Sequence, residues 1–278
     1  MNQRLKECKM EAVLGIFFDK LFIYNILLPL IVFGGIWAYC SLRPPNQKAH
    51  LVAAIEANNT NTVQSLLTKG VDVNGEAPNG RTPLMATFAS KTPNLYIAEL
   101  LIRRGAKVNA RDREDSSTPL MLAAEKSGTY GNADGVNFLL KHGADINAVD
   151  TLESSALARA IEAGQVAGVR ALLAAGAEPN DYSSLPGSPL ARAARQGNTD
   201  IMQLLLDRGA AINGRGSLGD TALTEAATYN RKNAVLLLLK HGANLDELGE
   251  NKKTALQEAS EKGNIEVVTL LKQAGARM

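Results

Sequence analysis

Histidine is the first residue type to consider in a search for acid–base or metal chemistry, and this chain has three: His50, His142 and His241. His142 and His241 each follow a lysine and precede a glycine. That pattern is typical of the end of a helix, where a cation is stabilised by the helix dipole. We therefore interpret these histidines as helix-terminal residues and not as metal ligands or catalytic groups.

Other residue types give no better start for catalysis. The motifs G-x-S-x-G and H-E-x-x-H and the phosphate-binding P-loop are absent from the sequence. The two cysteines, Cys8 and Cys40, lie outside the repeated region described below, which excludes a disulfide framework or a cysteine-based zinc site there. Glu125, Glu162 and Glu225 are expected to be solvated side chains on separate helices. The sequence predicts no catalytic residue, no cofactor and no metal, and hence a protein that is not an enzyme.

The elements that would position any site are repeated along the chain. A leucine and a glycine recur together, and both series settle to a spacing of 33 residues. A fixed period in this range indicates one supersecondary unit stacked on copies of itself, which produces an extended binding surface. We call these residues the landmark leucines and landmark glycines: Leu51, Leu84, Leu120, Leu157, Leu190, Leu223 and Leu256, with Gly70, Gly105, Gly143, Gly176, Gly209, Gly242 and Gly275.

Short phrases around the landmarks identify a family. Thr-Pro-Leu or a close variant opens most units, as at residues 82–84 and 118–120, and Gly-Ala followed by Asn closes most of them, as at 105–109. The chain resembles the ankyrin family over about residues 48 to 278, in seven units. The resemblance implies two antiparallel helices and a β-turn in each unit. It also shows one departure, because the histidine that ties down the turn in this family is replaced by Met85, Met121, Ala158, Ala191, Thr224 and Gln257.

The same fold follows from the hydrophobic pattern. Apolar residues in the second helix of each unit fall at i, i+3 and i+4, as at Val169, Leu172 and Leu173, which gives each helix one apolar stripe. The residue three positions after the landmark leucine is Thr87 in the second unit and alanine in the other six, so neighbouring helices can approach closely. We predict an all-α solenoid over residues 49–278, with the first and last units as caps.

A second strong feature precedes the repeats. Residues 21–42 contain no charge, and as a helix these 22 residues span roughly 33 Å, enough for a bilayer core of about 30 Å. We predict a transmembrane helix there, after an N-terminal segment at 1–20 and before a linker at 43–48. A cleaved signal peptide is the alternative, although its apolar region is usually only about 7 to 15 residues long.

The basic residues beside this segment predict its orientation. Arg4, Lys6, Lys9 and Lys20 precede it and two basic residues follow it closely, so the positive-inside rule keeps residues 1–20 in the cytoplasm. The repeats are then on the non-cytoplasmic side of the membrane, which in a bacterium is the periplasm. Six residues of linker reach at most roughly 20 Å, which holds the repeats near the lipid.

The overall charge narrows the class of partner. The formal net charge is +2, and the sequence has no Lys/Arg-rich block. Nucleic acid is therefore not an expected partner, and we expect another protein.

The resemblance also implies a binding face. In ankyrin arrays the turn tips and the outward positions of the first helices form a concave surface. On this chain the matching positions give the following candidates: Arg111, Arg113, Glu125, Lys126, Tyr182, Arg195, Gln196, Arg215 and Tyr229. Tyrosine and arginine are the types that most often anchor interfaces.

Two functions are consistent with these features. Some membrane-anchored bacterial proteins of the ankyrin type neutralise secreted toxins, including phospholipases, so the resemblance implies an immunity protein that binds a secreted effector or a membrane-associated enzyme. The alternative is a structural adaptor in a resident envelope complex.

Overall fold

The computed structural model describes residues 47–90, 92–126, 133–181, 187–216 and 219–277. Residues 47–278 form one compact unit. The expected segments at 1–20 and 21–42, and residues 43–46 of the expected linker, lie outside the described residues. None of the helices in the described part of the chain is both long and apolar enough to span a bilayer.

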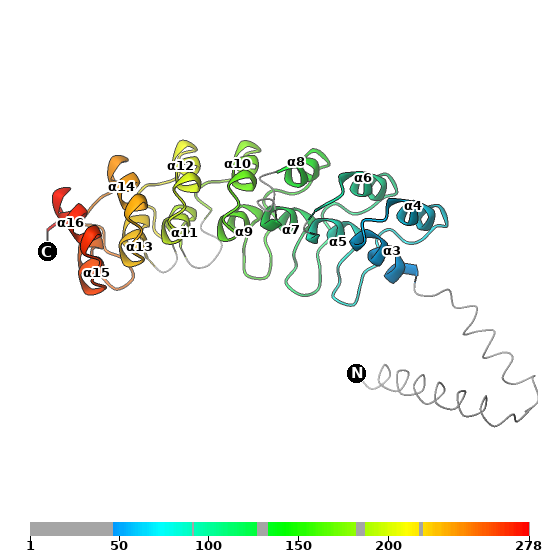
Figure 1. Cartoon of the computed structure of the whole chain (residues 1–278), viewed down its shortest axis with the longest axis horizontal. Coiled ribbons are helices and arrows are strands. Elements are labelled where there is room, and N and C mark those ends of the chain that lie inside the picture. Colours follow the sequence, from blue (N-terminus) through cyan, green and yellow to red (C-terminus); the bar gives the residue numbers. More distant parts are fainter. Residues whose placement is uncertain (1–46, 91, 127–132, 182–186, 217–218, 278) are drawn as a thin grey trace, which may run out of the picture. The chain divides into compact units, whose positions relative to one another are not determined.

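The described residues fold as a series of helix pairs. The first helix of each pair, here called the inner helix, is α3 Gln47–Glu56, α5 Pro83–Ala89, α7 Pro119–Lys126, α9 Ala156–Glu162, α11 Pro189–Gln196, α13 Ala222–Thr228 or α15 Ala255–Glu261. The second, or outer, helix is α4 Thr60–Thr68, α6 Leu95–Arg103, α8 Asp134–Lys141, α10 Val166–Ala174, α12 Thr199–Asp207, α14 Lys232–Lys240 or α16 Ile265–Gln273. Within residues 47–277, Figure 1 shows the inner and outer helices as two rows in sequence order.

The predicted periodicity is confirmed by burial. The landmark leucines are at most 2% exposed, and the apolar stripes of the outer helices face the core, with Val169 and Leu172 both at 0%. The small residues three positions after the landmark leucine are buried as well, and inner helices pack directly on their neighbours. Alanine at these positions allows that close packing, since each helix axis can approach the next one.

Side chains at the start of the inner helices make up for the missing histidine. Thr82, Ser155, Ser188, Thr221 and Thr254 each accept a hydrogen bond from the backbone N–H three residues on, as N-caps. In four units the residue in the histidine position closes a capping box by accepting from the N-cap N–H: Met85 Sδ at 3.4 Å, Met121 Sδ at 3.4 Å, Thr224 Oγ1 at 2.9 Å and Gln257 Oε1 at 2.9 Å.

The landmark glycines end the outer helices as predicted. All seven have a φ between +78° and +99°, the left-handed conformation that favours glycine. After the first six of them the chain leaves the helix and forms a loop toward the next unit (Figure 1). We call these connecting loops the fingers.

The fingers are closed by tight turns. Gly80 N–H donates to Ala77 O at 2.8 Å, Glu153 N–H donates to Asp150 O at 3.1 Å and Lys252 N–H donates to Gly249 O at 3.0 Å, and Gly219 N–H donates to Gly216 O at 2.9 Å. Among the described residues, the only pairing of β type is an isolated bridge between Val149 and Ser155. In each turn the accepting carbonyl belongs to the residue that follows Glu76, Val149, Arg215 or Leu248.

Candidate functional site

The fingers and the exposed positions of the inner helices form one face of the array, here called the inner face. Its central feature is Arg159 on α9, whose guanidinium lies among carboxylates from two fingers and a neighbouring helix. Arg159 Nη2 lies 2.6 Å from Asp150 Oδ2 and 2.6 Å from Asp115 Oδ2, and Nη1 lies 3.5 Å from Glu125 Oε2. This cluster links three segments from successive units.

Ionisation in this cluster is set by burial and hydrogen bonding together. Burial alone would lower the pKa of Arg159, but hydrogen bonds to Asp115 and Asp150 raise it above its usual value. Burial alone would raise the pKa of Asp115, but hydrogen bonds with Ser117 and Arg159 hold it well below its usual value. Arg159 and Asp115 are therefore both charged at neutral pH, and the hydrogen bonds of Arg159 are already made within the chain.

The next unit repeats the same pairing. Arg192 on α11 occupies the position of Arg159, and its Nη1 lies 3.0 Å from Glu162 Oε1 on α9. The Arg192 side chain is only 6% exposed, and burial lowers its pKa. In both cases an arginine two residues after the landmark leucine pairs with a glutamate of the preceding inner helix.

The charges at these positions are reversed in the sixth unit. Glu225 on α13 now occupies the arginine position, and Arg195 on α11 occupies the glutamate position. The two do not form an ion pair. Instead, the guanidinium carbon of Arg195 lies 4.9 Å from the ring centroid of Tyr229, a cation–π contact. Arg195 and Tyr229 are thus a preassembled, exposed pair at the end of two inner helices.

Glu225 is left in an unusual environment. Its Oε2 is buried and, among the described residues, has no hydrogen-bond partner. Burial and the nearby charges of Asp220 and Glu250 raise the pKa of Glu225 to about 7, and only Arg195 acts in the opposite direction. The expectation that Glu225 is an ordinary solvated side chain was wrong, because the stacked fingers and helices remove it from water.

Most of the other predicted site residues hold neighbouring units together. Arg111 donates to Val149 O at 2.5 Å, and Arg113 Nη2 pairs with Glu76 Oε2 at 2.5 Å. Gln196 donates to Glu162 O at 3.0 Å, and Arg215 pairs with Glu247. A partner that used these side chains would have to share or displace those contacts.

The remaining predicted residues divide into two cases. Glu125 and Lys126 form an ion pair at 2.8 Å on α7, at the end of the inner helix, and Glu125 also belongs to the Arg159 cluster. Tyr182 lies outside the described residues. Within the described part of the chain, no group of three or more His, Cys, Asp or Glu residues is arranged to hold a metal.

Sequence reasoning missed Arg159 and Arg192. The available signal was their position, two residues after the landmark leucine, where successive inner helices have Ala86, Leu122, Arg159, Arg192, Glu225 and Glu258. A long charged side chain there is adjacent to the small residue at which two inner helices meet, so it is covered by the neighbouring unit.

Comparison with known proteins agrees with this geometry. A family model described as ankyrin repeats in three copies matches residues 26–112, 50–150, 87–183, 157–247 and 190–278. The ankyrin repeat domain of human ASB11 superposes with a TM-score of 0.72 at 26% identity, over 82% of this chain and 98% of that one.

Curated relatives match over shorter stretches. Ankyrin repeat protein FPV031 of Fowlpox virus is 31% identical over 137 residues, which is 49% of this chain and 38% of the relative. Zygote-specific protein 3 of Chlamydomonas reinhardtii is 35% identical over 142 residues, which is 51% of this chain and 35% of the relative. The matched part of this chain thus spans little more than a third of either relative. On the family match, the repeated units and the superposition, this chain belongs to the ankyrin repeat family, whose arrays are protein–protein interaction modules.

Proposed function

We propose that the inner face binds another protein through the exposed pair formed by Arg195 and Tyr229. The observation that carries this proposal is their cation–π contact beside the half-buried Glu225. Tyr229 is 43% exposed, so its ring is accessible while Arg195 restricts its motion. Rigid aromatic and arginine side chains are the types that supply most of the binding energy in protein interfaces.

Replacement of both residues tests this proposal. In the full chain, the double variant Arg195→Ala, Tyr229→Ala should weaken capture of the partner at least about tenfold, since a hot-spot residue contributes about 2 kcal/mol or more. The matched control is Tyr96→Ala, Arg103→Ala, which removes the same residue types from the outer helix α6, where Tyr96 is 55% exposed. Equal capture by both variants would move the binding site elsewhere.

We propose further that the array is tethered to a membrane through residues 21–42, with the repeats on the non-cytoplasmic side. The support is the 22-residue charge-free stretch and the excess of basic residues before it. Alkaline phosphatase fused to the C-terminus should be active outside the cytoplasm of a bacterial host. A fusion that is active only as a cytoplasmic reporter would reverse this topology, and release of the array into the soluble fraction would favour a cleaved signal peptide.

A tether this short restricts the class of partner. With residues 21–42 in the bilayer, so short a linker would hold the start of the array near the lipid, which suits a partner that acts on lipid or lies in the bilayer. We therefore propose an immunity protein that occludes a membrane-attacking effector, such as a secreted phospholipase. The alternative, an adaptor of a resident envelope complex, predicts constitutive co-purification with membrane proteins.

Protection distinguishes these two functions. Cells that express the full chain should survive the toxic effector that is captured by crosslinking, and the Arg195→Ala, Tyr229→Ala variant should not protect them. Capture of resident membrane proteins without any protective effect would support the adaptor instead.

A further inference from the structure

The inner face has a hollow at its N-terminal end that the binding pair does not use. Two positions of each inner helix line this face, the second and the fifth residue after the landmark leucine. In the second unit alone both are alanine, Ala86 and Ala89, whereas every other unit has at least one larger side chain there. The pairs in the other units are Ala53 and Glu56, Leu122 and Glu125, Arg159 and Glu162, Arg192 and Arg195, Glu225 and Thr228, and Glu258 and Glu261.

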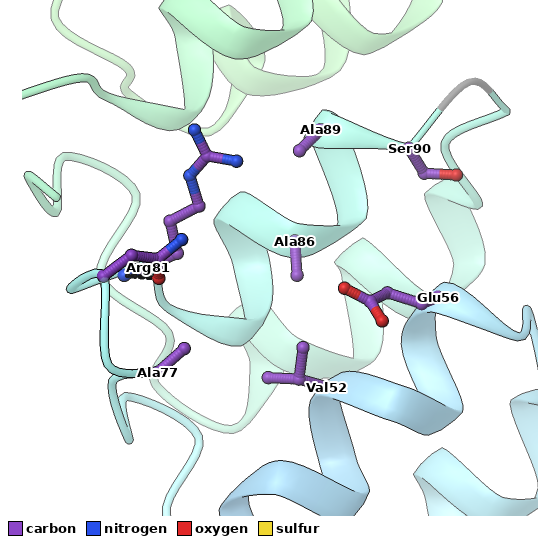
Figure 2. Close-up of a pocket in the computed structure, with 8 residues that line it drawn as sticks. Val52, Glu56, Ala77, Arg81, Ala86, Ala89 and Ser90 are labelled. Atoms are coloured by element: carbon purple, nitrogen blue, oxygen red, sulfur yellow. Dashed lines mark hydrogen bonds between the residues drawn. The ribbon is translucent and has the colours of Figure 1, made fainter. Parts of the chain in front are cut away.

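The two alanines leave a pocket of about 370 Å³ between α3 and α5. Its floor is apolar and consists of Val52, Ala86 and Ala89, and its walls are Glu56 at the end of α3 and Arg81 in the preceding finger. Figure 2 shows the Glu56 carboxylate projecting from α3 toward α5 across this hollow, with Arg81 on the other side. The pocket therefore combines an apolar base with a charged rim.

Two charged residues line the pocket, Arg81 and Glu56, and they differ in whether their charge is already paired. Arg81 is already engaged, since its Nε lies 3.5 Å from Asp112 Oδ2 and its Nη2 lies 3.6 Å from Glu114 Oε2. Glu56 is exposed and forms no ion pair with any residue in the described part of the chain. The positive charge of Arg81 is therefore offset by two carboxylates, whereas the Glu56 carboxylate that lines the pocket has no ion-pair partner among the described residues. Glu56 also ends α3, where the helix dipole adds partial negative charge.

We propose that this pocket accepts one lysine or arginine side chain of the protein partner. The methylene stem would lie on Val52, Ala86 and Ala89, and the cationic end would meet the carboxylate of Glu56. Long basic side chains combine these two parts, an apolar stem and a charged head. This inference rests on the proposed binding role, and it adds a second anchor remote from Arg195 and Tyr229.

A selection from a random peptide library tests the pocket without knowledge of the partner. Phage that display random dodecapeptides are selected on the full chain in detergent micelles and counter-selected on the variant Ala89→Gln. This substitution fills the hollow, and the fold tolerates longer side chains at the same position in other units, such as Glu162 and Arg195. The matched control is Thr228→Gln, which places the same glutamine at the corresponding position of the inner helix in the sixth unit.

The expected result is enrichment of lysine or arginine at one fixed place in the selected peptides. Their affinity should fall about tenfold on Glu56→Gln, because a charge-assisted contact is lost, and should stay unchanged on Glu266→Gln, where the glutamate lies in the last unit. Binding should also be lost on Ala89→Gln and kept on Thr228→Gln.

Three outcomes would overturn the proposal. Enrichment of aromatic or aliphatic residues would assign an apolar occupant, and peptides that bind Ala89→Gln equally well would place the anchor elsewhere. If no peptide is enriched on the wild-type chain relative to the filled variant, the pocket does not accept a side chain of a partner. If peptides depend on Tyr229 but not on Ala89, the binding role stands and only this pocket inference fails.

Discussion

At the scale of single residues, the most informative side chain is Glu225. Its pKa is raised to about 7 because burial and Asp220 disfavour the carboxylate. In the unfolded chain a glutamate has its ordinary pKa of 4.5, so the folded state binds the proton more tightly. Protonation of Glu225 therefore stabilises the folded state, and this stabilisation is lost as the pH rises from about 4.5 through 7.

We predict that Glu225→Gln stabilises the array at high pH only. The free energy of unfolding should increase by about 2 kcal/mol at pH 8, after an allowance for partial exposure to solvent, and should be almost unchanged at pH 4. Urea unfolding of the full chain at both pH values measures it. Glu266→Gln, an exposed glutamate in the last unit, should show no such pH dependence, and equal behaviour of the two variants would contradict the raised pKa.

The Arg159 cluster gives the opposite kind of prediction. Replacement of Arg159 by Met leaves Asp150, whose side chain is 2% exposed, without its ion-pair partner, and should destabilise the array by about 3 kcal/mol at pH 7. Because the pKa of Asp115 is lowered, the stabilisation is present above its usual value of 3.8 and is lost at more acid pH. The difference between wild type and variant should therefore shrink below about pH 4.

Lys232→Met is the control for Arg159→Met. It breaks a solvent-exposed ion pair with Glu266, and such pairs contribute at most about 1 kcal/mol. A similar loss of stability in both variants would show that the buried cluster contributes no more than a surface pair.

At the scale of elements, the row of small residues between inner helices sets how closely the units stack. Ala193 on α11 is fully buried where neighbouring inner helices meet. Ala193→Leu should destabilise the array by roughly 1–3 kcal/mol, because the added methylenes force the helices apart. Ala53→Leu, on the exposed side of α3, should have little effect. Urea midpoints compare the two, and an unchanged midpoint for Ala193→Leu would mean that the stack is looser than its burial indicates.

At the scale of the whole array, contacts run mainly between adjacent units. The region that loses protection after a destabilising substitution should therefore depend on the unit in which the substitution lies. Leu271 in the last unit and Leu172 in the fourth are both fully buried. Leu271→Ala should increase amide hydrogen exchange in α15 and α16 and leave α9 and α10 protected. Leu172→Ala should increase exchange on both sides of the fourth unit. Uniform loss of protection in both variants would indicate a single cooperative unit.

The two proposed anchor sites lie in different units of the array. The hollow floored by Ala86 and Ala89 lies in the second unit, and Arg195 and Tyr229 lie in the fifth and sixth. A stacked array presents both to one partner only if that partner is extended or has two contact points. The affinity of such a partner should therefore depend on both sites together.

The sequence alone determined the repeat and its register in the described region. The 33-residue spacing, the apolar stripes and the landmark glycines are local patterns, and each acts within one unit or between adjacent units. Burial of the landmark leucines and the positive φ of the glycines confirmed those predictions. The transmembrane helix at 21–42 and the role of Tyr182 stay predictions, since both lie outside the described residues.

Only the tertiary structure decided which charged side chains are free to bind. Arg159 and Asp115 are 44 residues apart, and Arg195 meets Tyr229 instead of Glu225. The partner that each side chain meets depends on its rotamer and on the burial that stacking imposes. No local sequence pattern encodes either of them. The hollow at Ala86 and Ala89 has the same origin, because a missing side chain becomes a pocket only when the neighbouring unit supplies its walls.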